Sequence, residues 1–385
     1  MSLHPVPPPP LGLYIHLPWC VRKCPYCDFN SHQAQARLPE AEYVSALLAE
    51  LAQYEAEYSS RPLISLFFGG GTPSLFSSES IHRLLDSIAR VWTFAHDIEI
   101  TLEANPGTVE TGKFQGFRAA GVNRLSIGIQ SFDEDCLKRL GRVHDRDQAL
   151  RAVDSARSAG FDHFNLDLMF GLPGQSLAQG LADLETALSL TPPHLSWYQL
   201  TLEPNTVFYK YPPRLPGDEA VWALQEAGLN RLEAAGYAHY EVSAHALSGF
   251  ECRHNLNYWQ FGDYLGIGAG AHGKLTDPAT ALITRTQTLR HPDHYLNPRS
   301  QTEPLTRRNV VPVDQYPFEF LMNHLRLRQG FDLSLYRMRT GLPLSSLEPG
   351  LSQCLADALL EQHGSQIRCT DSGWNFLDDV LQRFM

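Results

Sequence analysis

Three cysteines near the start of the chain lie close enough together to bind one metal centre. Cys20, Cys24 and Cys27 follow the spacing C-x3-C-x2-C, and no fourth cysteine lies nearby. Three thiolates on a short loop can bind three irons of a [4Fe-4S] cluster and leave the fourth iron open to a small chelating ligand. A zinc site that adds His32 or His16 as its fourth ligand is the alternative. The residues therefore predict a metal centre of one of these two kinds.

The composition is typical of a soluble globular protein. The chain has 385 residues, a net charge of −11 and 43% hydrophobic residues. This charge gives no general reason to bind nucleic acid, and we expect no such partner. The start MSLHPVPPPP lacks the features of a signal peptide, and no apolar run is long enough to cross a bilayer. We therefore expect a cytoplasmic protein with reduced thiols, in which the isolated Cys136, Cys354 and Cys369 are buried and inert.

Strands and helices alternate over the first half of the chain. Apolar runs predict strands at residues 13–16, 62–68, 97–103, 124–129, 163–170 and 194–200. Helical spacing of apolar residues predicts helices at residues 39–58, 77–91, 109–120, 133–140, 146–159 and 176–190. Because helical crossovers separate the strands, the strands should run parallel. The predicted fold class is α/β, a partial (β/α)6 barrel of the TIM type.

Polar and glycine-rich segments follow the carboxyl ends of these strands. In a parallel α/β barrel these ends meet at one rim, where ligands bind. The cysteines follow the first strand, and the later strand ends add GGGTPS at 69–74, Glu103, Gln130, Asp167, GLPG at 171–174 and TLEPNT at 201–206. This shared rim predicts one binding site. Together with the barrel pattern, it favours the iron–sulfur cluster over zinc.

The rest of the chain divides into smaller parts. A proline-rich lead covers residues 1–12, and the barrel is expected to span residues 13–215. The part 216–305 opens with a helix at 218–235 and continues into a Gly- and His-rich stretch, 237–273, which we expect to be irregular structure packed on the barrel. The last part, 306–385, has helical patterns at 316–328 and 351–363 and a hairpin pattern at 365–377. This order predicts a small winged-helix-like α+β domain.

The segment YIHLPWCVRKCPYCDFN, residues 14–30, resembles the signature of radical S-adenosylmethionine enzymes. In that superfamily the cofactor's amine and carboxylate chelate the open iron, and an electron from the cluster cleaves the cofactor to a 5′-deoxyadenosyl radical. The resemblance implies that the three cysteines bind the cluster. It also implies S-adenosylmethionine contacts from Tyr14, Tyr26, Gly70, Gly71, Thr72, Glu103, Gln130, Arg142 and Asp167.

These residue types suit a charged methionyl ligand, although several also have a simpler interpretation. Glycines let backbone amides approach a ligand, because they have no Cβ in the way. Carboxylates can accept hydrogen bonds from ribose hydroxyls or balance the sulfonium and amine charges. Alternatively, residues 69–71 form a simple tight turn, Glu103 is a charge at a helix amino terminus, and Arg142 is a solvated surface residue.

Further motifs narrow the resemblance to one branch of the superfamily. GGGTPS, EANPG, SIGIQSF, NLDLMFGLPG and HNLNYW resemble the branch of oxygen-independent coproporphyrinogen III oxidase and, more closely, a related family of haem chaperones. The oxidase pattern has a further cysteine two places after the third ligand, where this chain has Phe29. The oxidase also has a longer segment before the first strand. Both departures favour the chaperone.

The chaperone branch carries an H-N-x-x-Y-W motif that is associated with haem binding. This chain matches it with His254, Asn255, Tyr258 and Trp259. An imidazole can ligate haem iron, and the Tyr and Trp rings offer a flat apolar surface to a porphyrin. His254 can equally be a core or capping histidine, with Trp259 filling the barrel edge. Rival haem ligands are His245, His272, His291, His294 and, less favoured, Cys252.

The resemblance implies a haem chaperone that binds a [4Fe-4S] cluster, S-adenosylmethionine and haem. It would deliver haem to acceptor proteins, respiratory haem proteins being the acceptors that the family suggests. Such a role implies transient contact with a membrane surface, and it allows a homodimer formed on cluster binding. Two other functions fit the same residues: a radical enzyme of the coproporphyrinogen III oxidase type, and a zinc-stabilised binding module without redox chemistry.

Overall fold

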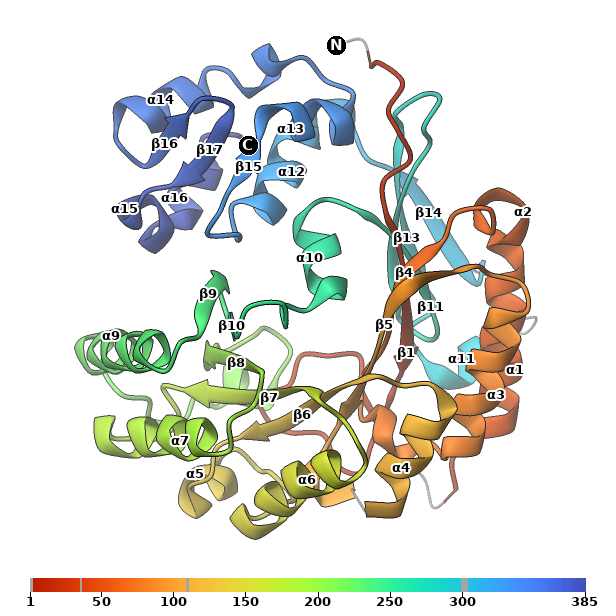
Figure 1. Cartoon of the computed structure of the whole chain (residues 1–385), viewed down its shortest axis with the longest axis vertical. Coiled ribbons are helices and arrows are strands. Elements are labelled where there is room, and N and C mark those ends of the chain that lie inside the picture. The colour runs from red at the N-terminus through yellow and green to blue at the C-terminus, as the bar shows by residue number, and fades with distance from the viewer. Residues whose placement is uncertain (1–2, 35–36, 109–110, 299–303) are drawn as a thin grey trace.

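The structure is a computed structural model that describes residues 3–34, 37–108, 111–298 and 304–385. In these residues one sheet of twelve strands runs in the order β14-β13-β12-β11-β1-β4-β5-β6-β7-β8-β10-β9 (Figure 1). Its central strands, which pair in parallel, are β1 (Leu11–Leu17), β4 (Leu63–Gly70), β5 (Phe94–Ala104), β6 (Arg124–Gln130), β7 (His163–Phe170) and β8 (His194–Gln199). All six predicted strands are therefore present.

Helices connect these strands and cover the outer face of the sheet (Figure 1). They are α1 (Glu40–Leu51), α2 (Glu55–Tyr58), α3 (Ser78–Ala89), α4 (Thr111–Ala120), α5 (Glu134–Arg139), α6 (Arg146–Ser158) and α7 (Leu177–Ser189), and α8 (Val207–Lys210) and α9 (Asp218–Ala234) follow β8. Val109, where the third predicted helix was expected to begin, lies outside the described residues. The predicted fold class, a partial (β/α)6 barrel with a C-terminal α+β unit, is confirmed.

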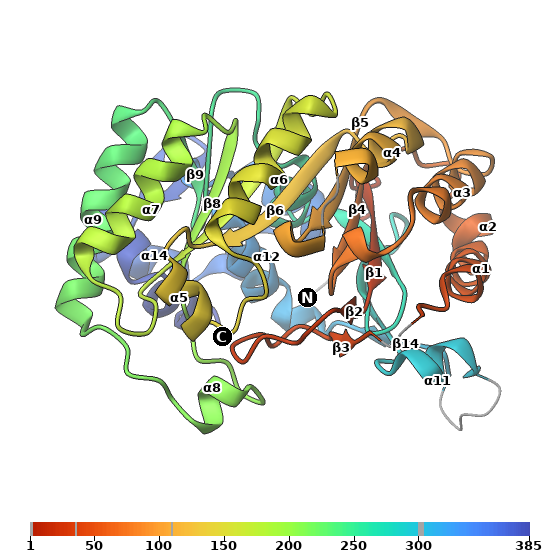
Figure 2. The same cartoon turned by 90° about the horizontal axis from the view of Figure 1, so that it is seen from below.

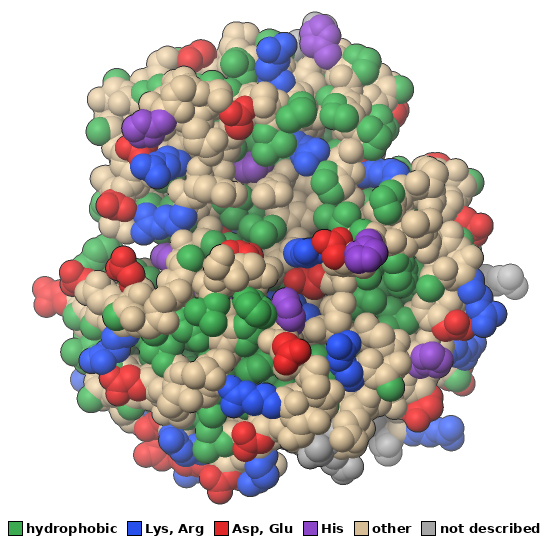
Figure 3. All heavy atoms as spheres, viewed as in Figure 1, with side chains coloured by type: hydrophobic (Ala, Val, Ile, Leu, Met, Phe, Trp, Pro, Cys, Tyr) green, Lys and Arg blue, Asp and Glu red, His purple; other side chains and the backbone are tan. Residues whose placement is uncertain are grey.

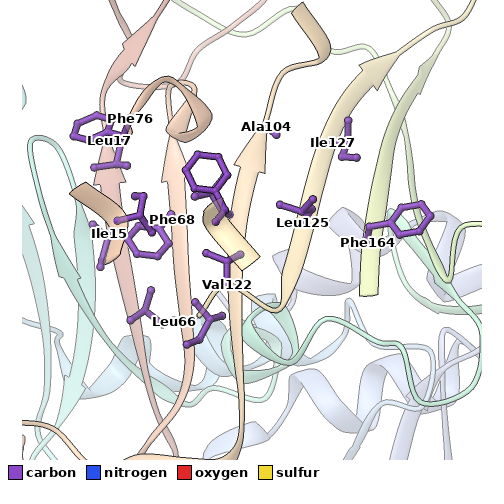
Figure 4. Packing of buried hydrophobic residues seen from close by; sticks show 14 of the residues in the cluster. Ile15, Leu17, Leu66, Phe68, Phe76, Ala104, Val122, Leu125, Ile127 and Phe164 are labelled. Carbon is purple, nitrogen blue, oxygen red and sulfur yellow. The ribbon is translucent and has the colours of Figure 1, made fainter. Parts of the chain in front are cut away.

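Each central strand presents an apolar face and a polar face. On the outer face, side chains such as Leu66, Phe68, Leu125 and Ile127 pack in one core against the helices (Figure 4). The side chains between them point to the inner face, since side chains alternate along a strand. This inner set is polar on most strands and includes Ser65, Glu99, Thr101, Glu103, Arg124, Ser126, Asn165, Asp167, His194 and Ser196.

The Gly- and His-rich stretch 237–273 was expected to be irregular, and that prediction is wrong. It contains β9 (Ala238–Glu241), β10 (Ala244–Ala246), α10 (Arg253–Trp259), β11 (Asp263–Ile267) and β12 (His272–Thr276). β11 pairs in parallel with β1, and β12, β13 (Ile283–Thr288) and β14 (Thr306–Val310) continue the sheet in antiparallel pairing. β10 and β9 extend the opposite edge beside β8. Strands of three to five residues are too short to show a clear alternation of apolar residues.

The last part of the chain forms a separate three-stranded sheet with helices. It consists of α12 (Tyr316–His324), β15 (Phe331–Asp332), α13 (Leu333–Thr340), α14 (Gly350–Ala356), β16 (Leu360–His363), β17 (Gln366–Cys369), α15 (Asp371–Asn375) and α16 (Leu377–Gln382). Two predictions were wrong here: residues 360–363 are strand and not helix, and the hairpin ends at Cys369. Ala358, at φ 53°, turns the chain after α14, and Thr370 caps α15 by accepting a hydrogen bond from the Gly373 N–H.

The parts meet around α10, which lies between the sheet and the C-terminal helices α12 and α13 (Figure 1). The predicted division at residues 12/13, 215/216 and 305/306 stays a prediction, although β14 belongs to the large sheet. In the described ranges, no helix combines the length and the apolar character that crossing a membrane requires. On the face shown in Figure 3, basic and acidic side chains are interspersed.

Candidate functional site

A cavity of about 690 Å³ lies on the inner face of the sheet. It reaches from the loop after β1 to α10 and to the segment after α12. Every predicted site residue lines it: Cys20, Cys24, Cys27, Tyr14, Tyr26, Gly70, Gly71, Thr72, Glu103, Gln130, Arg142, Asp167, His254, Asn255, Tyr258 and Trp259. The fold thus brings the three predicted sets together in one space, while their roles stay predictions.

The cysteine loop leaves β1 through the short strand β2 (Trp19–Cys20) and returns through β3 (His32–Gln33), which pairs with it. Figure 2 shows both strands between α5 and α11 (Pro292–Leu296). Asn30 anchors the loop, because its side-chain amide donates hydrogen bonds to the carbonyl oxygens of Ala269 and Arg290, each at 2.8 Å. The loop is therefore held by the second half of the chain.

The three thiols of this loop are free and half-buried. Burial raises the pKa of the Cys20 and Cys27 thiols, and the Arg142 guanidinium lies 3.7 Å from the Cys24 sulfur. Within the described part of the chain, no three His, Cys, Asp or Glu side chains are grouped so that they could hold a metal ion. A cluster would thus require the loop to draw its thiols together. The three thiols fit a [4Fe-4S] cluster with one open iron. They are free and line one cavity, and no fourth cysteine is among the described residues that line it.

The alternative fourth ligands of a zinc site are engaged elsewhere. The His16 Nε2–H donates to the Asn30 carbonyl oxygen at 2.9 Å, and its Nδ1 accepts from the Tyr14 hydroxyl at 3.0 Å. His32 lies outside the cavity lining, and its ring contacts that of His291 with 5.1 Å between centroids. Neither imidazole faces the three thiols with a free nitrogen.

The glycines at the end of β4 and directly after it are required by close packing. Gly70 has φ 114°, and a Cβ there would lie 2.5 Å from the His16 ring. A Cβ on Gly71 would lie 2.5 Å from the carbonyl oxygen of Trp19, at the start of the cysteine loop. Thr72 donates its backbone N–H to that same oxygen at 2.7 Å. These glycines therefore position the cysteine loop, which gives them a role beyond a simple tight turn.

Two carboxyl groups lie on the wall of the cavity with unusual proton affinity. Glu103 accepts a hydrogen bond from the Gly70 N–H at 3.2 Å. Burial, together with the nearby Asp167, raises the pKa of Glu103 to about 8. Burial also raises the pKa of Asp167, which accepts hydrogen bonds from Ser126 and Asn165. A cationic ligand such as a sulfonium would favour the charged carboxylates, so this pair fits S-adenosylmethionine.

Gln130 and Arg142 each keep a buried polar atom without a partner. Gln130 ends β6 at φ 61°, and its Oε1 is unpaired. Arg142 donates through Nη2 to the Gly128 carbonyl oxygen at 2.8 Å, while its Nε is unpaired. The interpretation of Arg142 as a solvated surface residue is therefore wrong. Unpaired buried groups beside a cavity are suited to a polar ligand.

Helix α10 closes the opposite end of the cavity. The His254 ring is buried and stacks on Phe67 with 4.9 Å between centroids. Its Nδ1 lies 2.9 Å from the Ser65 hydroxyl and its Nε2 lies 3.0 Å from the Tyr258 hydroxyl. Burial and the nearby Arg124 lower the pKa of His254 to about 3, so the ring is neutral. Both ring nitrogens have partners, and ligation of iron by His254 would require its Nε2 to leave Tyr258.

The rival haem ligands do not line the cavity. His245 is buried against His239, with 4.2 Å between ring centroids, and its ring nitrogens have no partner. His291 and His294 lie on or beside α11, near His32. His272 begins β12 and is exposed. The thiol of Cys252 is buried against Glu99, and burial raises its pKa to about 12.

The sequence analysis missed a second set of polar residues in the cavity wall. These residues are Arg124, Ser126, Asn165, His194, Ser196, Glu241, Ser243 and Arg326. Most lie on the inner face of the barrel strands, where polar residues alternate with apolar ones, as in RLSIGIQ and HLSWYQ. Because these strands were expected to be buried, their alternating polar residues could have indicated a polar cavity on the inner face. Arg326 gave no such signal, because it reaches the cavity from the C-terminal part.

Comparison with known proteins shows which family the chain belongs to. The radical SAM superfamily model matches residues 14–187, and the HemN C-terminal domain model matches residues 311–376. The protein named heme chaperone HemW from Haemophilus influenzae is 49% identical over 381 residues, which cover 98% of each chain. The chain belongs to the HemW family. The HemW proteins of Escherichia coli and Bacillus subtilis are 48% and 36% identical, and the matches cover 98% and 97% of this chain.

This HemW-family chain also has the same fold as a solved structure of a more distant protein. Coproporphyrinogen III oxidase (HemN) from Escherichia coli, described as a radical SAM enzyme, matches with a TM-score of 0.82. The match covers 98% of this chain and 90% of that chain, at 22% sequence identity. This likeness shows that the two proteins share a fold over almost the whole chain.

Proposed function

We propose that this protein is a haem chaperone that binds a [4Fe-4S] cluster, S-adenosylmethionine and haem, and that delivers the haem to acceptor proteins. One observation carries the proposal: a single cavity is lined by the three-cysteine loop, by the residues predicted to bind S-adenosylmethionine and by the HNxxYW residues of α10. The names of the relatives, heme chaperone HemW, support it. Respiratory proteins as acceptors, transient contact with a membrane surface, a cytoplasmic location and a homodimer on cluster binding belong to the same proposal.

The residues around the cysteine loop are suited to hold the two cofactors. Cys20, Cys24 and Cys27 would bind the cluster, which supplies a single electron when bound. Glu103 and Asp167 would balance the positive charges of S-adenosylmethionine, and Gly70, Gly71 and Thr72, which line the cavity, would lie beside its methionyl group. The unpaired Gln130 Oε1 can accept a hydrogen bond from a ligand.

Haem is assigned to the α10 end because aromatic rings gather there. Tyr258 lies 4.1 Å from Tyr264 between ring centroids, and Trp259 lines the cavity nearby. Flat rings of this kind suit the faces of a porphyrin. His254 is the axial ligand in this proposal, and it would exchange its hydrogen bond with Tyr258 for the iron.

The test combines iron loading with haem transfer. Anaerobic reconstitution should load about four irons per chain, and Cys20→Ala, Cys24→Ala and Cys27→Ala should each abolish loading. Cys136→Ala is the matched control, because its thiol is buried away from the cavity. Haem should bind in a one-to-one ratio, and His254→Ala should shift the Soret band and speed haem loss to apomyoglobin. Loading of Cys24→Ala together with failure of Cys136→Ala would contradict the ligand assignment.

The second candidate is a radical enzyme of the coproporphyrinogen III oxidase type. The shared fold with HemN favours it, whereas Phe29, which stands where the oxidase pattern has a cysteine, speaks against it. Phe29 lies at the cavity and is 59% exposed. Conversion of coproporphyrinogen III to protoporphyrinogen by the reconstituted protein would establish this candidate. Zinc in place of iron in the purified protein would support the zinc-stabilised module.

A further inference from the structure

Arg124 is a buried cation whose side chain is largely without hydrogen-bond partners. It begins β6, is 4% exposed and lines the cavity. Its nearest ion pair is weak, with 3.8 Å between its Nε and Glu99 Oε2. The Glu99 carboxylate is already engaged, because it accepts the backbone N–H groups of Arg253 and His254 at 3.1 and 3.0 Å. Among the described residues, none hydrogen-bonds the Arg124 guanidinium.

Arg326 lies at the other end of α10. Its guanidinium carbon lies 4.3 Å from the centre of the Trp259 ring, and its Nη2 donates to Glu241 at 3.2 Å. The Arg326 Nε and the Trp259 Nε1 are buried without partners. Thus one arginine lies near the amino end of α10 and another near its carboxyl end. The wall between them carries the aromatic rings of Tyr258 and Trp259.

We propose that Arg124 and Arg326 bind the two carboxylates of the tetrapyrrole, so that this end of the cavity selects a planar apolar ring with two acidic side chains. A guanidinium binds a carboxylate through two parallel N–H donors, which suits Arg for this role better than Lys. Haem carries two propionates, so the inference rests on the proposed haem binding and specifies it. Arg124 offers its free donors, and Arg326 exchanges Glu241 for the ligand.

A structural role for Arg124 makes a different prediction. If Arg124 only balances the charges of Glu99 and Asp167, removing the ligand's carboxylates would not change the protein's affinity for that ligand. Esterification of the ligand separates the two cases, because it removes both charges and keeps the ring. Iron-free ligands are used so that ligation by His254 or another residue does not contribute.

The experiment compares protoporphyrin IX with its dimethyl ester, measured by fluorescence titration of the full-length protein. The parent should bind the diacid roughly tenfold or more tightly than the diester, as charged hydrogen bonds predict. Arg124→Gln and Arg326→Gln should each lose most of that preference through weaker diacid binding. Arg124→Lys should recover part of it.

Matched controls remove a charge outside the cavity. Arg253→Gln removes an arginine of α10 that pairs with Asp97 at the surface. Arg328→Gln removes an arginine that stacks on Trp374 and pairs with Asp371, as Arg326 does with Trp259 and Glu241. Both controls should keep the parent's preference.

Three outcomes overturn the inference. Equal affinity of the parent for diacid and diester would exclude carboxylate recognition while leaving haem binding intact. Retention of the full preference in folded Arg124→Gln and Arg326→Gln would place the recognition elsewhere. Failure of both porphyrins and of haem to bind the parent would overturn the proposed function together with this inference.

Discussion

Gly71 lets the start of the cysteine loop pack closely against the end of β4, because it has no side chain. A Cβ would collide with backbone atoms of Pro18 and Trp19, and backbone cannot rotate away as a side chain can. We expect Gly71→Ala to lower stability by about 1–3 kcal/mol and to reduce iron loading, because the start of the cysteine loop must shift. Thermal unfolding and iron content measure the two effects. Gly112→Ala in α4 is the control, since its added Cβ would meet no atom within 4 Å beyond the backbone of its own helix. Equal behaviour of the two variants would contradict the packing argument.

Glu103 makes the stability of the cofactor-free protein depend on pH. Its pKa of about 8 lies above the ordinary value of 4.5, so the folded state holds a proton that the unfolded state releases between those two values. The stability that this group contributes is therefore present below about pH 4.5 and is lost as the pH rises towards 8. We expect Glu103→Gln to be more stable than the parent at pH 8 and similar to it at pH 4.5. Urea unfolding at both pH values measures this, and a constant difference between the proteins would contradict it.

At the scale of elements, the cysteine loop depends on Asn30 as an anchor. Asn30→Ala removes both hydrogen bonds to the carbonyl groups of Ala269 and Arg290 and leaves all three thiols in place. We expect the variant to load iron but to lose its visible absorption several times faster in air, because a looser loop exposes the cluster. Gln33→Ala, at an exposed position of the same loop, should match the parent. An unchanged rate for Asn30→Ala would show that β2 and β3 hold the loop without it.

The elements themselves were predictable to different extents. The strand that carries Leu66 has a long apolar run and the strand that carries Leu125 alternates polar and apolar residues, and the helices beside them have regular apolar spacing, so both types followed from the sequence. β10 and β11 are short, and neighbours distant in the chain stabilise them: Leu11 pairs with Asp263 and Ser196 with Ala244. Pairing with distant strands cannot be predicted from the local sequence.

The candidate site was predictable where a motif carried it. Cys24 and Gly70 belong to motifs with a recognisable chemistry, and both line the cavity. Arg124 belongs to no motif, since its importance comes from the inner face of β6. Arg326 could not be assigned from the sequence, because only the packing of the C-terminal part on β9 and on the turn after it brings it to α10.

At the scale of the whole molecule, the C-terminal part is attached to the barrel through the segment that contains Arg326. The Val242 N–H donates to the Arg326 carbonyl oxygen, and the Arg328 N–H donates to that of Tyr240, each at 3.1 Å. The buried Glu241 stabilises this contact through its ion pair with the partly exposed Arg326. We expect Glu241→Ala to speed hydrogen exchange of the Val242 and Arg328 amides roughly tenfold or more, as loss of a charged hydrogen bond predicts.

Amides inside the C-terminal sheet, such as that of Ile367, should keep their protection in this variant. Glu361→Ala, which removes a surface ion pair with Arg368, serves as the control and should leave the Val242 and Arg328 amides unchanged. Uniformly faster exchange throughout the protein would mean that Glu241→Ala destabilises the whole fold and not the attachment alone.

The position of β1 between β4 and β11 has a consequence for how the protein is made. Leu11 pairs with Asp263, about 250 residues later in the chain, and the ribosome adds about 5–20 residues per second. During that interval β1 has only one of its two neighbours, and the carbonyl groups that anchor Asn30 come later still. The cysteine loop therefore gains its full support only after most of the chain has left the ribosome. We expect iron to be inserted after translation, into a nearly complete protein.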